Sequence, residues 1–100
     1  MIISQYPAAS VELDEAVAWY AQRSPQAAIG LWRKVMHARG LIAAYPLANP
    51  LIGGSARRFV LYGYPYDVIY SVEDRNILIV AYAHHKRQPA YWKNRLRKVN

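Results

Sequence analysis

The sequence predicts an α+β, two-layer domain: a helical hairpin packed on a mainly antiparallel sheet, in the order β-α-α-β-β-β with a short C-terminal helix. Apolar residues recur at helical spacing in the first half of the chain and alternate with a period of two in the second half. The sheet offers the only large apolar surface that the hairpin can cover. With 100 residues, 54% of them hydrophobic, the chain suffices for one core, and we expect a single domain over residues 1–100.

The first two expected elements are a strand and a helix. Residues 2–6 alternate as a short strand, which Pro7 ends. From Ala8 to Arg23 the apolar residues return at helical spacing. Acidic side chains lie near the start of this stretch and Arg23 lies at its end, as the helix dipole favours.

A second helix is expected to begin at Ser24-Pro25, because serine caps helices and proline suits their first position. It should end near Tyr45, since a proline follows. The short link between the helices predicts an antiparallel hairpin. Gly30 and Gly40 are unfavourable inside a helix, and we expect one of them to mark close packing or an early end. The residues expected between the hairpin and the sheet are Leu13, Tyr20, Trp32, Val35 and Ile42.

The second half of the chain predicts a loop and three strands. Residues 46–55 contain two prolines and two glycines and are expected to form the loop. The strands are expected at residues 57–62, 66–72 and 77–83, and the short turns between them make neighbours antiparallel. The last strand is apolar on both faces, which is typical of a central strand. After Pro89 a short helix is expected, carrying Tyr91, Trp92, Arg95 and Leu96.

The positive charge is concentrated at the C-terminal end. Thirteen Lys and Arg residues against six Asp and Glu give a net charge of +7. Residues 84–100 hold six of the basic residues and no acidic one, so residues 1–83 carry a net charge of only +1. A small domain with its charge at one end is expected to bind an anionic partner, either nucleic acid or an acidic protein.

The sequence argues against several function classes. The chain has no cysteine, which removes disulfides and thiolate sites and fits a reducing cytoplasm. No apolar run approaches the roughly 18 residues that span a bilayer, and the N-terminus lacks a secretory pattern, so we expect a cytoplasmic protein with no membrane contact. The last acidic residue, Asp74, precedes His84 and His85, which as neighbours on a strand point to opposite sides. We therefore expect no metal and no cofactor.

Residues 83–92 combine side chains that suit phosphate chemistry. Lys and Arg neutralise phosphate, His can transfer a proton near neutral pH, and Tyr and Trp offer stacking faces. Metal-free RNA cleavage needs a base, cations and an acid, and His85, Arg87 and Tyr91 are the candidates for these catalytic roles. The candidates for binding a partner or nucleic acid are Arg57, Arg58, Lys86, Arg87, Tyr91, Trp92, Lys93 and Arg95.

A packing or solvent-exposed role is the alternative for each candidate. Aromatic residues dominate small cores, so Tyr91 and Trp92 would then dock the last helix. Histidines at a strand end and a run of Lys and Arg are common on surfaces. Arg57 and Arg58 point to opposite faces of their strand, so we expect only one of them to join a site.

An ordered set of stretches resembles the RelE/ParE superfamily of bacterial type II toxin–antitoxin toxins. The stretches are residues 18–25, 57–59, 64–70 and 77–87, followed by Tyr91-Trp92. The resemblance covers nearly the whole chain and agrees with the predicted order of elements. It implies a toxin that inhibits growth and serves plasmid stabilisation, and it implies a cognate acidic antitoxin with which the toxin forms a hetero-oligomer.

The superfamily has two functional branches. RelE-like toxins are metal-free ribonucleases that cut mRNA on the ribosome, whereas ParE-like toxins poison DNA gyrase. The ribonucleases tend to carry an arginine at the position that Asp67 occupies here, and a carboxylate would repel the scissile phosphate. Tyr91 also lies closer to Arg87 than in the ribonuclease pattern. The resemblance therefore favours a gyrase inhibitor; the alternatives are a ribosome-dependent mRNA endonuclease and a non-toxic nucleic-acid-binding module.

Overall fold

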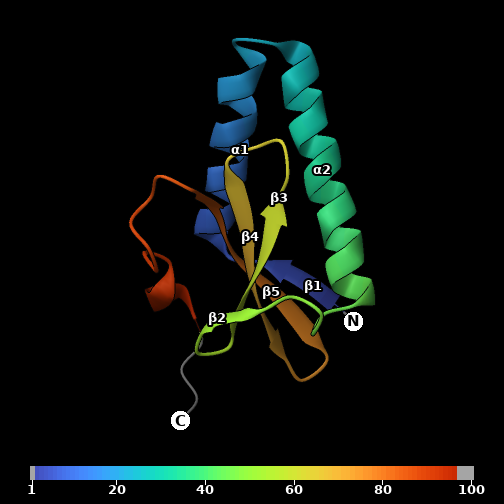
Figure 1. Ribbon diagram of the computed structural model, residues 1–100, viewed down its shortest axis with the longest axis vertical. Helices are drawn as coiled ribbons and strands as arrows, with labels where there is room; N and C mark the ends of the chain where they lie inside the picture. The colour runs from blue at the N-terminus through green and yellow to red at the C-terminus, as the bar shows by residue number, and fades with distance from the viewer. Residues whose placement is uncertain (1, 97–100) are drawn as a thin grey trace.

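The computed structural model describes residues 2–96, and the basic residues Arg97 and Lys98 of the predicted cationic end lie outside the described residues. A helical hairpin packs on one face of a five-stranded sheet (Figure 1), which confirms the predicted fold class. The elements are β1 (Ile2–Gln5), α1 (Pro7–Ala21), α2 (Pro25–Ala44), β2 (Leu51–Gly53), β3 (Ala56–Leu61), β4 (Tyr66–Glu73), β5 (Asn76–His84) and η1, a 3-10 turn (Lys93–Arg95).

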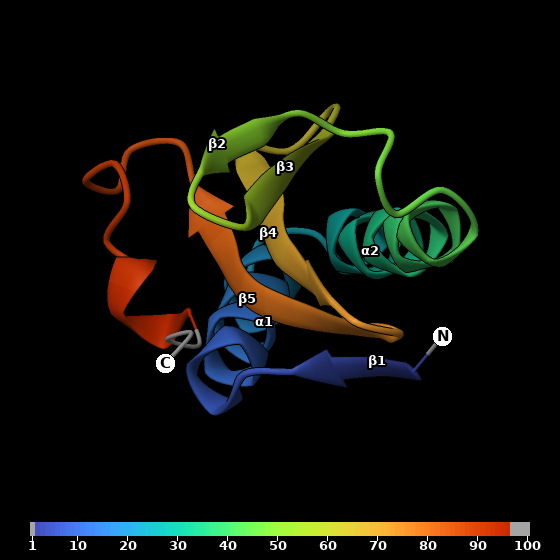
Figure 2. The same ribbon diagram turned by 90° about the horizontal axis from the view of Figure 1, so that it is seen from below.

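The strand order in the sheet is β1-β5-β4-β3-β2. β1 pairs with β5 in parallel, and all other pairs are antiparallel. β5 is therefore interior, as its apolar sequence predicts. In Figure 2, α2 and the chain that follows β5 lie on opposite sides of β4 and β5. None of the helices within residues 2–96 has the length and apolar character needed to cross a membrane.

α2 begins at its predicted capping residues and ends at Ala44, next to the predicted end at Tyr45. The Ser24 hydroxyl accepts a hydrogen bond from the backbone N–H of Ala27 at 3.2 Å, and Pro25 opens α2. Gly30 marks a close approach, because a Cβ there would collide with the Tyr64 hydroxyl. That hydroxyl donates a hydrogen bond of 2.7 Å to the Ala27 carbonyl. The β3–β4 turn is thereby fastened to α2.

Most of the predicted hairpin core is confirmed. Leu13, Val35 and Ile42 are buried between the helices and the sheet, and Tyr20 is half-buried against the same cluster. The prediction for Trp32 is wrong, because 48% of this residue is exposed. The residues of α2 that face the sheet are Ala28, Leu31, Val35, Ala38 and Ile42. Trp32 lies about 100° round the helix from Leu31 and so leaves that stripe.

A β-bulge in β5 sets which residues face the helices. Ile69 pairs with Ala81 and Tyr70 with Ile79, so Val80 has no partner in β4. Val80 and Ala81 both pack on the face away from the helices, and Tyr82 returns to the helix face. Strict alternation would have placed Tyr82 with Val80 on the opposite face.

Two predictions for irregular segments are corrected. The expected loop at residues 46–55 contains the short strand β2, which pairs with β3 before Gly54 turns the chain at a φ of 55°. The expected C-terminal helix is reduced to the 3-10 turn, which neither Tyr91 nor Trp92 joins. Ala90 has a φ of 60°, a left-handed conformation that a right-handed helix cannot contain.

Candidate functional site

Residues 85–96, here called the C-terminal segment, pack against the sheet face away from the helices. Trp92 anchors the segment, because it is buried in a cluster with Ala56, Ile69 and Val80. The packing alternative for Trp92 is therefore observed. Small side chains on β3 and β5 make room for the indole, and Tyr91 and Leu96 are partly buried against the same cluster.

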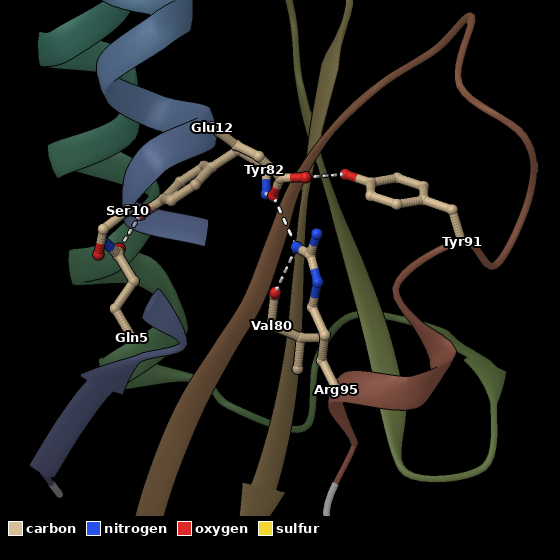
Figure 3. Close-up of polar contacts among 7 residues, drawn as sticks. All are labelled: Gln5, Ser10, Glu12, Val80, Tyr82, Tyr91 and Arg95. Atoms are coloured by element: carbon tan, nitrogen blue, oxygen red, sulfur yellow. Dashed lines mark hydrogen bonds and ion pairs between the residues drawn. The ribbon is translucent and has the colours of Figure 1, made fainter. Parts of the chain in front are cut away.

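Glu12 fastens the C-terminal segment to α1 (Figure 3). One carboxylate oxygen accepts a hydrogen bond from the Tyr91 hydroxyl at 2.6 Å. The other accepts from the Arg95 guanidinium at 2.9 Å and from the backbone N–H of Tyr82 at 3.1 Å. Arg95 also donates to the carbonyl of Val80 at 3.2 Å. Two of the predicted site residues are thus engaged in holding the fold together.

The Glu12 contact also changes the acidity of Tyr91. Burial raises the pKa of the Tyr91 hydroxyl well above its ordinary value, and the hydrogen bond to the Glu12 carboxylate raises the pKa further. The guanidinium groups of Arg87 and Arg95 lie 3.9 and 5.2 Å from the ring centroid. Tyr91 therefore stays protonated at neutral pH, and its O–H group already donates a hydrogen bond to the Glu12 carboxylate.

The two histidines at the end of β5 have different surroundings, as their opposite directions predict. His85 Nε2 lies 2.9 Å from a carboxylate oxygen of Asp67 on β4. The ring of His84 packs edge-on against Tyr66. Burial lowers the pKa of His84, and the nearby His85 and Lys86 lower it further, so His84 is neutral at pH 7. Asp67 and His85 form the ion pair when the imidazole is protonated.

A cleft of about 530 Å³ lies between the C-terminal segment and strands β3 to β5, and we call it the Arg58–Arg87 cleft. Its buried side chains are those of Ile69, Ala83 and Trp92. Exposed cations, Arg58 and Arg87, lie at its rim. The remaining residues that line it are Ile52, Val60, Asp67, His84, His85, Gln88, Pro89, Ala90 and Tyr91. The cleft is thus apolar below and mainly cationic above.

The cleft brings together some of the predicted site residues and not others. His85, Arg87 and Tyr91 all line it, as do Arg58 and Trp92. Arg57 faces the other way, as predicted for one of the two arginines, and its guanidinium donates to the carbonyl oxygens of Leu47 and Asn49. The remaining predicted binding residues, Lys86, Lys93 and Arg95, do not line the cleft.

Sequence reasoning missed Glu12. It lies in the first half of α1, where an acidic residue is ordinary, and its partners are 70 to 83 positions away. No local signal distinguishes it from Glu15, which lines a second hollow of about 390 Å³ beside Trp19 and Tyr66. Within residues 2–96, no three His, Asp or Glu side chains gather in a way that would hold a metal ion.

Comparisons with known proteins establish the class of fold. No protein-family model and no curated protein matches the chain. Among solved structures, the chain is similar to one described as "Chromosomal ParDE TA system from P. aeruginosa", with a TM-score of 0.66. The match covers 84% of this chain and 95% of that chain at 15% identity. At this identity the likeness shows a shared fold, and that fold agrees with the RelE/ParE resemblance in the sequence.

Proposed function

We propose that this protein is the toxin of a type II toxin–antitoxin module, that it inhibits DNA gyrase in the cytoplasm, and that a cognate acidic antitoxin neutralises it in a hetero-oligomer. The observation that carries the proposal is the fold shared with a chain of the ParDE system over most of both chains. The RelE/ParE resemblance supports the same role from the sequence. The toxin domain would comprise residues 1–100.

The surroundings of the candidate catalytic groups favour gyrase over RNA as the target. Cleavage of RNA without a metal needs a free proton donor and cations directed at the phosphate. Tyr91 and Arg95 instead bind the Glu12 carboxylate. Asp67 adds a second carboxylate, which lines the cleft that the phosphate would enter. These contacts support a protein that acts by binding.

The exposed cations of the C-terminal segment suit such a binding role. Lys86, Arg87 and Lys93 are exposed around the buried anchor Trp92. A charged rim speeds encounter with an anionic protein surface and selects the partner, while its energy is spread over several contacts. No proton transfer is needed for this mechanism.

A ribosome-dependent mRNA endonuclease is the second candidate, because one observation favours it. The imidazole of His85 is held by Asp67 in a cleft that also contains Arg58 and Arg87. A carboxylate can orient an imidazole for proton transfer, and the two arginines could neutralise a phosphate.

Two assays on the purified protein separate the candidates. We expect inhibition of supercoiling by purified gyrase and no cleavage of mRNA on translating ribosomes. Arg87→Ala should weaken the inhibition, whereas His85→Ala, which removes the imidazole paired with Asp67, should leave it unchanged. Site-specific mRNA cuts with gyrase unaffected would instead support the endonuclease. Activity in neither assay, together with binding to DNA or RNA that falls steeply with salt, would favour the non-toxic nucleic-acid-binding module.

A further inference from the structure

The Arg58–Arg87 cleft lies on the sheet face that the helices do not cover. Its lower wall is apolar, with Ile69, Ala83 and Trp92 buried there and Val60 partly exposed beside them. A volume of about 530 Å³ falls in the range of roughly 300–1,000 Å³ that binding pockets occupy, which is ample for one large side chain and its neighbours. The shape and lining therefore suit an apolar group that enters from solvent.

The charge at the rim is positive once the internal pair is set aside. Among residues 2–96, Asp67 is the only one with a carboxylate that lines the cleft, and its oxygen lies 2.9 Å from His85. Within residues 2–96, Arg58 makes no ion pair, and the guanidinium of Arg87 lies over the Tyr91 ring. Lys86 is exposed next to Arg87. An occupant with carboxylates beside its apolar group would complement this rim.

We propose that the Arg58–Arg87 cleft docks an acidic segment of the antitoxin, which seats one large apolar side chain on Ile69, Ala83 and Trp92 and carries carboxylates on either side of it. The inference rests on the proposed function and names the surface that neutralisation uses. A segment of this kind is disordered alone and orders on binding.

Charge argues for this occupant over the two others that the cleft could take. A second copy of the chain would carry a net charge of +7 and bring like charge to a cationic rim. A nucleic acid would offer phosphates to Arg58 and Arg87, but Trp92 is buried and the Tyr91 ring is covered by the Arg87 guanidinium, so neither aromatic ring offers an open face on which a base could stack. Only an acidic peptide matches both the rim and the apolar floor.

The probe for the test is a synthetic peptide, acetyl-Glu-Glu-Leu-Trp-Glu-Glu-amide, titrated into the full-length ¹⁵N-labelled protein. We expect saturable amide shifts centred on Val60, Ile69 and Ala83. Two control peptides separate the apolar contribution to binding from the charged one. The first replaces Leu-Trp by Ser-Ser, and the second replaces every Glu by Gln. Each should bind about tenfold more weakly, which corresponds to about 1.4 kcal/mol.

Matched variants of the protein test the charged contribution at Arg58 and the apolar contribution at Val60. Arg58→Glu should weaken peptide binding about tenfold, or about 1.4 kcal/mol, in low salt and much less in 1 M salt, where screening is nearly complete. Arg33→Glu makes the same charge change on α2 outside the cleft and should have little effect. Val60→Phe should fill the cleft and weaken binding at both salt concentrations. Val11→Phe, at an exposed position of α1, is its control.

Several results would overturn the docking inference. They are the absence of saturable binding, shifts centred on another surface, or equal losses in the cleft variants and their controls. Thermal melts of each variant establish that the fold is intact, and Arg58→Glu changes only an exposed side chain. Growth arrest by the wild-type protein is measured separately. Arrest with the peptide bound elsewhere overturns the docking site alone. Binding in the cleft without gyrase inhibition or arrest overturns the toxin proposal, and with it the antitoxin as occupant, and leaves the cleft as a site for an acidic segment.

Discussion

The two faces of the sheet are held in different ways. The helix face meets α1 and α2 through a continuous apolar cluster that includes Leu13, Leu31, Val35, Tyr70 and Ile79. The other face meets the C-terminal segment through Trp92 and a few small residues, together with the polar contacts at Glu12. Many apolar contacts make the first face a cooperative core, whereas few anchors make the second face easier to open locally. The second face is also where the cleft and the exposed cations lie, so the binding that we propose would use the less firmly held side.

The largest effect should follow from a cavity on the helix face. Leu13 is buried between α1 and the sheet, and Leu13→Ala should lower the free energy of unfolding by about 2–5 kcal/mol. Val11→Ala, at a residue that is 52% exposed on the same helix, should change it by about 0.5 kcal/mol or less. Urea denaturation curves give both values. Similar midpoints for the two variants would mean that the helices pack by another face.

A smaller loss should follow on the other face when Glu12 loses its charge. Glu12→Gln keeps the shape but weakens hydrogen bonds to Tyr91 and Arg95, and it leaves a mostly buried guanidinium without its counter-charge. We expect a loss of about 1.5–3 kcal/mol, with amide exchange accelerated first in the C-terminal segment. Glu15→Gln, at an exposed residue of the same helix, is the control. Uniform acceleration across the sheet would show that the two faces unfold as one unit.

Growth assays should show which side chains of the C-terminal segment toxicity depends on. Arg87→Ala and Lys93→Ala should each weaken toxicity in part, since a charged interface spreads its energy over several contacts. His85→Ala should leave toxicity nearly unchanged; loss of a catalytic proton-transfer group would instead cost roughly 10²–10⁴ in rate. Arg95→Ala should weaken toxicity as well, but through release of the segment from Glu12.

Asp67→Arg provides the sharper test of whether the protein is a ribonuclease or a gyrase inhibitor. It would restore the ribonuclease-branch residue, and it would remove the carboxylate that pairs with His85 in the wild type. We expect no RNA cleavage from the wild type or from Asp67→Arg, because Tyr91 stays bound to Glu12 in both. Primer extension on ribosome-bound mRNA checks this. New cuts from Asp67→Arg would mean that the rest of a nuclease centre is present.

The smallest effect concerns alkaline stability. The pKa of Tyr91 is raised in the folded protein, so folding retains a proton that the unfolded chain loses above about pH 10. The stability that this retained proton contributes is complete below the pKa of the unfolded chain. It is lost progressively as the pH rises from there through the pKa of the folded protein. Tyr20, Tyr66 and Tyr82 also have pKa values raised by burial and add to this slope. Unfolding free energies measured between pH 8 and pH 11 should therefore fall less steeply for Tyr91→Phe than for the wild type. Parallel curves would show that Tyr91 ionises freely.

The secondary structure could be predicted because its signals are local. Pro7, Ser24 and Pro25 fix the helix starts, and the alternating strands fix the antiparallel meander. The directions of Arg57 and Arg58 followed from strand geometry alone. The prediction for Trp32 was wrong because hydrophobicity does not say which of two neighbouring stripes on a helix meets the sheet.

The order of elements, the two-layer architecture and the accumulation of cations near the C-terminus could all be predicted from local patterns of residues. The contacts of those cations and their neighbours depend on the packing of distant segments. The β5 bulge, which turns Tyr82 toward the helices, depends on pairing between strands. Glu12 meets Tyr91 and Arg95 across 79 and 83 positions. Such contacts form when packing brings distant segments together, and no short-range pattern of residue types encodes them. For that reason residues 83–92 looked catalytic in the sequence, whereas the fold commits Trp92 to packing, holds Tyr91 against Glu12, and leaves Arg87 at the rim of a cleft.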